Sequence, residues 1–160
     1  MRLNEKVAII TGSGSGIGRG IALAMAKEGA HVVIIDINQE VAEATLRAVN
    51  AYQEGLLFIK DISKQENVSG IVEEVIEQYG KIDILVNNAH ASKQAHFMDT
   101  TQDMFDLSFN TGFYPTVHFM QAAYPHLKAS QGSVINFASG AGLNGQPTQT
   151  AYAAAKEAIR

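Results

Sequence analysis

The glycine-rich segment Thr11-Gly12-Ser13-Gly14-Ser15-Gly16-Ile17-Gly18 directly follows the apolar run Val7-Ala8-Ile9-Ile10. A short continuous apolar run is typical of a parallel strand that is buried on both faces. The alanine-rich stretch from residue 17 to residue 28 predicts a helix, with Gly29 as its stop. Because glycine permits a tight turn between such a strand and such a helix, the segment predicts one strand–turn–helix unit of an α/β fold.

Apolar runs and helical patterns alternate along the rest of the chain. Further strands are predicted over 32–35, 56–59, 82–86 and 133–137, and further helices over 39–50, 102–128 and from about residue 150. Asn38 is the expected cap of the helix over 39–50. Ser63 and Glu66 have the spacing of a capping box before a helix that ends at Gly80. Pro115 predicts a bend in the helix over 102–128, and residues 140–145 are expected to form a glycine-rich loop.

This alternation indicates an α/β fold with a doubly wound parallel sheet and right-handed crossovers. The expected Rossmann-like strand order is 3-2-1-4-5. Residues 1–160 are interpreted as a single dinucleotide-binding domain.

The composition excludes several classes of function. The net charge is −4 and the lysines and arginines form no cluster, which argues against a nucleic-acid partner. There are no cysteines, and His31, His96, His118 and His126 show no ligand spacing, so no metal is expected. No apolar run approaches the length of a membrane span and no leader pattern precedes the first strand. We therefore expect no membrane partner and a cytoplasmic location.

Gly12, Gly16 and Gly18 predict a phosphate site at the first turn. Without Cβ atoms they let a pyrophosphate approach the backbone, and the helix that begins near Ile17 offers free N–H groups and the positive end of its dipole. A tight turn without a ligand is the simpler alternative, but Asp36, 18 residues after Gly18 at the end of the second strand, favours a dinucleotide. An ATPase-type phosphate loop is excluded, because no Gly-Lys-Ser/Thr ending is present.

Ser139, Tyr152 and Lys156 form a second group of chemically active residues. Tyr152 and Lys156 are four residues apart in a predicted helix, so their side chains share a face. An ammonium beside a phenol stabilises the phenolate, which allows the phenol to exchange a proton with a carbonyl or an alcohol. Ser139 follows the strand over 133–137 and is expected to hold the same substrate oxygen. A serine-hydrolase function is disfavoured, because no Gly-x-Ser-x-Gly elbow surrounds Ser139.

The Thr-Gly-x-x-x-Gly-x-Gly segment, Asn87-Asn88-Ala89 and the Ser139, Tyr152 and Lys156 group together resemble the compact branch of the short-chain dehydrogenase/reductase family. The resemblance covers essentially the whole chain. It implies an oxidoreductase that acts on CH–OH groups, with Ser139, Tyr152, Lys156 and Asn110 as catalytic residues. The cofactor-binding residues that it implies are Gly12, Ser15, Gly16, Ile17, Gly18, Asp36, Asp61, Ile62, Asn88, Ala89, Tyr152 and Lys156.

Asp36 predicts NAD rather than NADP as the cofactor. A carboxylate at the end of the second strand accepts hydrogen bonds from ribose hydroxyls and repels a 2′-phosphate. Ser15 supports the same choice, since relatives that prefer the phosphorylated cofactor often carry a basic residue at that position. Asp61 matches the family position that contacts the adenine amino group, and an ordinary loop acid is the alternative.

His90 is the clearest departure from the family pattern. It stands where the family's Asn-Asn-Ala-Gly segment has glycine, and its side chain either crowds the cofactor, stacks beside it or points outward. Asn110 matches the family asparagine that holds a water beside the lysine in a proton relay, and a local helix bond is its alternative role. Thr11 is interpreted as structural, tying the first strand to the segment near Asn87.

The compact members of the family continue for about 90 more residues and complete a sheet of the six-strand type or larger. We therefore expect the later strands and the substrate-binding segment to be absent from this chain, and the dinucleotide-binding domain to be incomplete at its C-terminus. The 160-residue chain alone is then expected to bind NAD weakly without turnover.

Three functions follow from these observations. The leading hypothesis is an NAD-dependent oxidoreductase that interconverts a secondary alcohol and a ketone. The second is a catalytically silent nucleotide-binding module, and the third, disfavoured by the glycine spacing, is a sugar-nucleotide epimerase or dehydratase.

By resemblance the complete protein is expected to form a homo-oligomer, a tetramer or dimer, through the helix over 102–128 and the helix near Thr150. Phe113, Val117, Met120 and Ala123 are expected to supply apolar surface there, with core packing as the alternative.

Overall fold

The computed structural model describes residues 1–160 and contains one five-stranded parallel sheet in the order β3-β2-β1-β4-β5. The predicted strand order is therefore confirmed. The strands are β1 (Val7–Thr11), β2 (His31–Asp36), β3 (Leu56–Ile59), β4 (Ile84–Asn87) and β5 (Ser133–Asn136). All the described pairings are parallel, so the carboxyl ends of the strands meet at one edge of the sheet.

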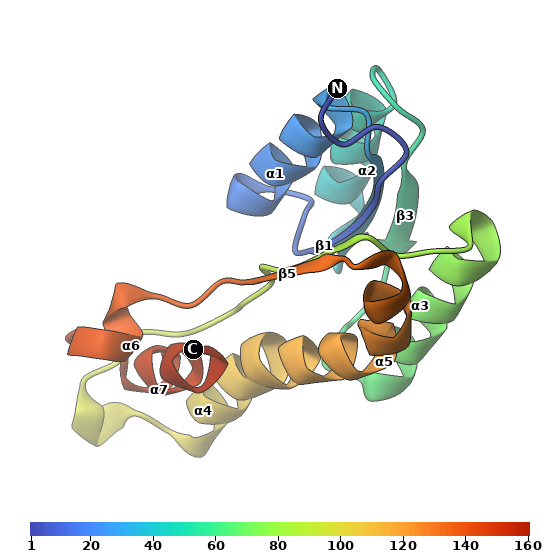
Figure 1. The fold of residues 1–160 in the computed structure, drawn as a ribbon. Helices are drawn as coiled ribbons and strands as arrows, with labels where there is room; N and C mark the ends of the chain where they lie inside the picture. Colours follow the sequence, from blue (N-terminus) through green and yellow to red (C-terminus); the bar gives the residue numbers. More distant parts are fainter.

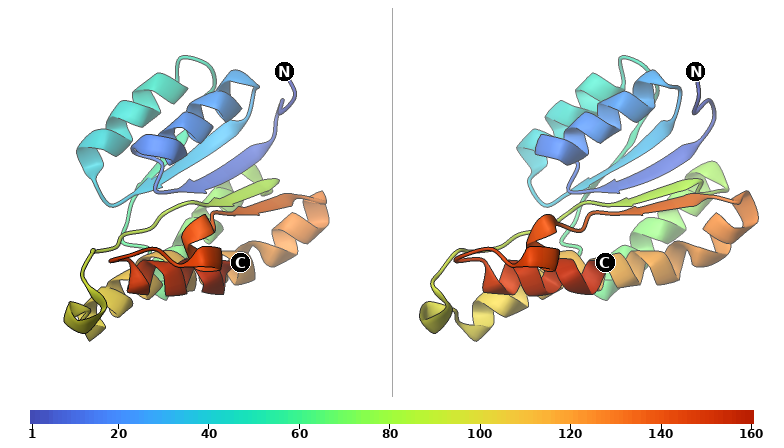
Figure 2. Two further views of the ribbon diagram at one scale, coloured as in Figure 1. Left: turned by 90° about the vertical axis from the view of Figure 1, so that its left-hand side faces the viewer. Right: turned by 60° about the vertical axis from the view of Figure 1, so that its left-hand side comes forward.

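Helices cover both faces of the sheet (Figures 1 and 2). On one face lie α1 (Gly16–Lys27) and α2 (Gln39–Val49), and on the other lie α3 (Gln65–Tyr79) and α5 (Tyr114–Ser130). The short helix α6 (Gly140–Asn144) and α7 (Thr150–Ile159) pack together beside α4 (Gln102–Ser108) at one end of the molecule (Figure 1). A single 3₁₀ turn, η1 (Phe97–Asp99), precedes α4. No helix combines the length and the apolar character that crossing a bilayer requires.

Strand β1 shows how the sequence builds two cores. Val7 and Ile9 join the cluster beneath α3 and α5, whereas Ala8 and Ile10 join the cluster beneath α1 and α2. Successive side chains of a strand point to opposite faces, so a run of apolar residues serves both layers at once. Each fully buried isoleucine contributes roughly 1.5–3 kcal/mol relative to exposure. The continuous apolar run is therefore explained by burial on both faces.

The ends of the helices agree with the sequence in part. The Asn38 side chain accepts a hydrogen bond from the Val41 N–H at 3.4 Å, and Gly80 ends α3 in the left-handed conformation with φ of 71°. The capping box at Ser63 is wrong. The helix begins after Lys64, and the Ser63 N–H donates to the carboxylate of Asp61 at 3.0 Å. Asp61 turns the backbone one step earlier, so Ser63 lies in the turn rather than at the cap.

The long helix predicted over 102–128 is interrupted. Between α4 and α5 lies the wider π-helical segment η2 (Phe109–Phe113), where the Tyr114 N–H donates to the Phe109 carbonyl five residues earlier. Pro115, in the first turn of α5, follows directly. Because proline has no N–H to donate, the regular ladder cannot continue through it. The irregularity that Pro115 predicted is therefore present as a π-helical segment on its N-terminal side.

Two further expectations need correction. Residues 140–144 form the helix α6 rather than a loop, because the Ser139 hydroxyl accepts a hydrogen bond from the Ala141 N–H at 3.2 Å and caps the helix. On α5, Met120 is 40% exposed, but Ala123 is fully buried in the core beneath the sheet. Ala123 therefore supplies no surface for assembly.

Candidate active site

The glycine turn has a backbone path that only glycine fits. Gly12 has a φ of +61°, and a Cβ atom built there would lie 2.9 Å from the Ala89 Cα. A Cβ atom on Gly18 would overlap the Gly12 carbonyl oxygen and lie 2.6 Å from the Asn88 side chain. The turn therefore lies flat against the segment after β4. Ser15 precedes α1 but its side chain caps no N–H group, so the first turn of α1 has no side-chain partner.

Thr11 joins the glycine turn to the segment after β4, as predicted. Its hydroxyl oxygen accepts hydrogen bonds from the N–H groups of Asn88 and Ala89, both at 3.0 Å. The Asn88 amide in turn donates to the carbonyls of Thr11 at 2.9 Å and Gly12 at 3.1 Å. These bonds fix the position of both chain segments at the carboxyl end of the sheet.

Asp36 lies at the end of β2, where the sequence predicted it. One carboxylate oxygen accepts from the Gly14 N–H at 2.9 Å and the other from the Asn38 N–H at 3.0 Å. These backbone donors hold the carboxylate in one orientation beside the glycine turn. Ser13 reinforces the turn, because its hydroxyl donates to the Ile10 carbonyl and accepts from the Ile35 N–H.

A cavity of about 430 Å³ opens at this edge of the sheet. Its walls include eight of the residues predicted to bind the cofactor, namely Gly12, Ser15, Ile17, Asp36, Asp61, Ile62, Asn88 and Ala89. The sequence did not single out Ile37, Lys60, Ala91 or Thr111, which also line it. Ile37 and Lys60 directly follow the ends of β2 and β3, so their positions in the chain were the available signal.

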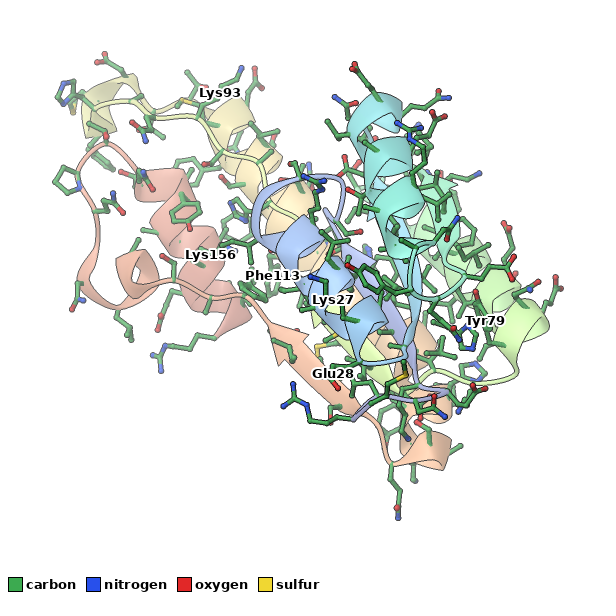
Figure 3. The ribbon with its side chains drawn as sticks, turned by 90° about the horizontal axis from the view of Figure 1, so that it is seen from above. Lys27, Glu28, Tyr79, Lys93, Phe113 and Lys156 are labelled. Carbon is green, nitrogen blue, oxygen red and sulfur yellow. The ribbon has the colours of Figure 1, made fainter.

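Tyr152 and Lys156 share one face of α7, as their spacing predicted. The Lys156 ammonium lies 5.8 Å from the centre of the Tyr152 ring and donates to the Phe137 carbonyl at 2.6 Å. Lys156 is only 5% exposed, and burial lowers the pKa of its ammonium. Figure 3 shows Lys156 on α7 close to Phe113, far from Tyr79 on α3. α7 therefore packs against the π-helical segment η2.

Ser139 follows β5 directly and stands at the start of α6, which packs against α7. The Ser139 oxygen already accepts from the Ala141 N–H, and its own proton has no acceptor among the protein's hydrogen bonds. A serine in this state can donate that proton to a ligand oxygen.

His90 lies at the end of the cavity, half-buried, beside Tyr152. The two rings meet edge to face, with centres 4.9 Å apart and planes at 83°. Burial, together with the positive charge of Lys156, lowers the pKa of His90 to about 4. Sequence reasoning noted that His90 departs from the family pattern but left its orientation open. The structure turns the imidazole inward, against Gly112.

Asn110 lies in η2, which packs against α7, but it makes no side-chain hydrogen bond to the other predicted catalytic residues. It is exposed and lines a separate surface hollow with Phe105, Phe109 and Tyr114. The only hydrogen bond of the Lys156 ammonium goes to the Phe137 carbonyl. Asn110 and Lys156 therefore share no direct hydrogen bond. No group of three or more acidic or histidine side chains is placed to hold a metal ion.

Comparison with known proteins gives a consistent result. The model of the short chain dehydrogenase family matches residues 6–160. A 12alpha-hydroxysteroid dehydrogenase from a Clostridium species is 46% identical, over 97% of this chain and 63% of its own length. A sorbitol dehydrogenase from Cereibacter sphaeroides is 38% identical, over 99% of this chain and 62% of its own length.

A solved structure of an NAD⁺-bound xylitol dehydrogenase superimposes with a TM-score of 0.95 at 32% identity, covering 99% of this chain and 62% of that protein. The chain thus spans somewhat less than two-thirds of the length of these relatives.

Proposed function

Because this chain belongs to the short-chain dehydrogenase/reductase family, we propose that it takes part in the NAD-dependent interconversion of a secondary alcohol and a ketone. The family binds nicotinamide cofactors, and the relatives compared above are named for a hydroxysteroid, sorbitol and xylitol, which are all alcohols. The single observation that carries the proposal is the pairing of Tyr152 with the buried Lys156 on one face of α7.

The residues around the cavity fit a dinucleotide. The close packing of Gly12 and Gly18 on Asn88 and Ala89 holds the turn in place, and Gly12 lines the cavity, where a pyrophosphate can approach its backbone. The uncapped first turn of α1 offers N–H donors and the positive end of the helix dipole. Asp36 faces the same cavity with a carboxylate suited to ribose hydroxyls. When bound, NAD supplies the acceptor or donor of the hydride.

We propose that Tyr152 exchanges the proton with the substrate and that Ser139 holds the substrate oxygen. In the oxidation direction, the carbinol hydrogen leaves with its electron pair as hydride, and the hydroxyl proton passes to the Tyr152 phenolate. The product is a ketone, with the proton on the Tyr152 oxygen. The positive charge of Lys156 stabilises the phenolate, and the Ser139 hydroxyl donates a hydrogen bond to the substrate oxygen. Asn110, exposed in a separate hollow, stays a prediction without a contact that supports it.

We propose a preference for NAD over NADP. The Asp36 carboxylate is held in place by two backbone N–H groups, so it cannot easily turn away from a 2′-phosphate. Lys60 lines the same cavity and is the cation available to a 2′-phosphate if this assignment fails. Calorimetric titration with NAD and with NADP tests the preference. Asp36→Ala should weaken NAD binding and reduce the difference between the two affinities. Equal or reversed affinities of the unaltered chain would reject the role of Asp36.

The reaction is tested with a panel of secondary alcohols and NAD, following nicotinamide absorbance, in a version of the chain extended to the length of its relatives. Tyr152→Phe should abolish turnover and spare cofactor binding, because it keeps the ring and removes only the exchangeable proton. Turnover of Tyr152→Phe within a few-fold of the unaltered chain would move the acid/base role elsewhere.

A nucleotide-binding module without turnover is the second candidate. It is favoured by the lining of the cavity, which includes eight residues predicted to bind the cofactor but neither Tyr152 nor Lys156. Strong NAD binding without oxidation of any alcohol in the panel would select this candidate. No NAD binding would reject both candidates together.

A further inference from the structure

His90 and Gly112 fit each other. His90 follows β4 in the segment Asn88-Ala89-His90, and Gly112 lies in the π-helical segment η2. A Cβ atom built on Gly112 would overlap Nδ1 of the His90 ring and lie 2.7 Å from its Cε1. Real Cβ atoms do not come so close to another atom. Any side chain at position 112 would therefore displace the imidazole.

The imidazole lies between the cavity and the proposed acid/base residue. On one side it lines the 430 Å³ cavity with Gly12, Ala89 and Thr111. On the other side it meets the Tyr152 ring edge to face at 4.9 Å. His90 is the one side chain that both lines this cavity and contacts Tyr152 through an aromatic pair.

Both ring nitrogens of His90 are buried and neither has a hydrogen-bond partner in the protein. Buried polar atoms in native proteins nearly always bond to protein, ligand or ordered water. A neutral imidazole offers one donor and one acceptor. Since His90 borders the cavity, a polar ligand that enters the cavity can supply the missing partner once the imidazole turns toward it.

Two other roles for His90 fit less well. A ring that only fills space would not need its two nitrogens, and a residue that exchanges protons at neutral pH would need a pKa closer to 7. Burial and the charge of Lys156 lower the pKa of His90 to about 4. At pH 7 roughly one imidazole in a thousand is then protonated. His90 is therefore suited to orient its neighbours by hydrogen bonding and packing, and unsuited to exchange protons at neutral pH.

We propose that His90 is a positioning residue: seated on Gly112, it holds the Tyr152 ring in place and hydrogen-bonds the dinucleotide bound in the cavity. The inference rests on the proposed cofactor and goes beyond it, because His90 then links cofactor binding to the orientation of Tyr152. The residue acts through Tyr152 and takes no proton itself.

The first test measures NAD affinity by calorimetry on the chain as it stands. His90→Phe keeps an aromatic ring against Gly112 and Tyr152 but removes both nitrogens, and NAD binding should weaken about tenfold, the worth of one hydrogen bond to a ligand. His90→Gln restores a donor and an acceptor and should recover part of the affinity. Unchanged NAD affinity in His90→Phe would overturn the proposal and leave the proposed function intact.

The second test uses Gly112. Gly112→Ala should expel the imidazole and weaken NAD binding to the same degree as His90→Phe, and the two changes combined should be no worse than either alone. Gly70→Ala is the matched control, because a Cβ atom on Gly70 in α3 meets nothing within 4 Å. Additive losses from Gly112→Ala and His90→Phe would show that the two positions act independently and would contradict the proposal.

A third measurement needs no variant and so does not depend on how the altered chains fold. Nitrogen-detected NMR of the histidine rings should show His90 as a neutral imidazole whose ring-nitrogen shifts move when NAD is added. Ring-proton contacts between His90 and Tyr152 should persist in the complex. If NAD binds and the His90 shifts stay fixed, the imidazole does not touch the dinucleotide. If NAD does not bind at all, the proposed cofactor is wrong, which is a separate result.

Discussion

Asp83 and Lys156 are the two charged residues that the fold buries. Asp83 lies just before β4, where its carboxylate accepts from the Lys6 ammonium at 2.8 Å and from the Val7 N–H at 3.0 Å. Burial raises the pKa of Asp83, but the hydrogen bonds from Lys6 and Val7 and the nearby charge of Lys81 outweigh burial, so the pKa lies below its ordinary value. The carboxylate therefore stabilises the start of β1 in its charged form.

We predict that Asp83→Asn lowers the free energy of unfolding by about 2 kcal/mol at pH 7, because a weaker acceptor is left beside two cations. A lowered pKa in the folded state means that this contribution is present above pH 3.8 and is lost as the pH falls through the folded value. Urea unfolding at several pH values measures both effects. Glu74→Gln, on the exposed face of α3, is the control and should change little.

His90 makes a pH-dependent contribution of the same sign as that of Asp83, although its neutral form is the one that the fold favours. The groups that face it are Tyr152 and Lys156 on α7 and Gly112 in η2. Asp36, Lys60 and Asp61 are the charged groups that line the same cavity. Its folded pKa of about 4 lies below the ordinary value of 6.5, so the unfolded chain binds a proton first as the pH falls.

We predict that stability from His90 is complete above pH 6.5 and decreases between pH 6.5 and about 4. His90→Gln should flatten the dependence of the unfolding free energy on pH within that window. The measurement is urea unfolding across the window, paired with NMR titration of the imidazole. A His90 titration near its ordinary pKa would show that the ring is not buried against Gly112 and Lys156.

Among the elements, the glycine turn and α1 make the sharpest test of the nucleotide site. Gly18 and Gly20 are two residues apart in α1, but only Gly18 is enclosed. A Cβ atom on Gly18 would overlap the Gly12 carbonyl oxygen, whereas one on Gly20 meets nothing within 4 Å. The turn therefore depends on one of the two glycines.

We predict that Gly18→Ala weakens NAD binding more than tenfold, because the turn must move away from its position over Asn88. Gly20→Ala should bind NAD normally and stabilise the chain by up to about 1 kcal/mol through helix propensity. Calorimetry and thermal unfolding on both variants provide the comparison. Equal NAD affinities in the two variants would mean that the turn does not hold the pyrophosphate.

At the scale of the whole molecule, the sheet gathers the sequence-distant residues at one edge, and η2 and α5 together carry an aromatic surface. Phe109, Phe113 and Tyr114 form a connected group of rings, and Tyr114 stacks on His118. Met120, Tyr124 and Tyr114 are exposed. Aromatic residues and methionine are enriched at interfaces between protein subunits.

We predict that the protein self-associates through this surface. Light scattering should report a species larger than a monomer, and Tyr114→Glu should shift it toward the monomer by placing a charge within the ring group. Glu74→Gln serves again as the control. A monomer at all concentrations tested, for the folded unaltered chain, would contradict the prediction.

Much of the fold was predictable from local patterns. The strand order, the two-faced burial of β1, the Asn38 cap and the end of α3 at Gly80 follow from periodicity and from residues with restricted backbone conformations. The sequence also predicted that Asp36 ends β2 and that Tyr152 and Lys156 share one face of α7, because the end of a parallel strand and a four-residue helical spacing determine direction without reference to the rest of the chain.

The residues that meet around Tyr152 were decided by the tertiary structure. The π-helical segment η2, which contains Asn110 and Gly112, adds a residue to one helical turn, and each added residue rotates the following side chains by about 100°. Asn110 lies at the surface, and Gly112 faces inward. The empty position at Gly112 then admits His90 from a segment 22 residues earlier in the chain. Such a fit depends on packing between distant segments, which no local pattern encodes.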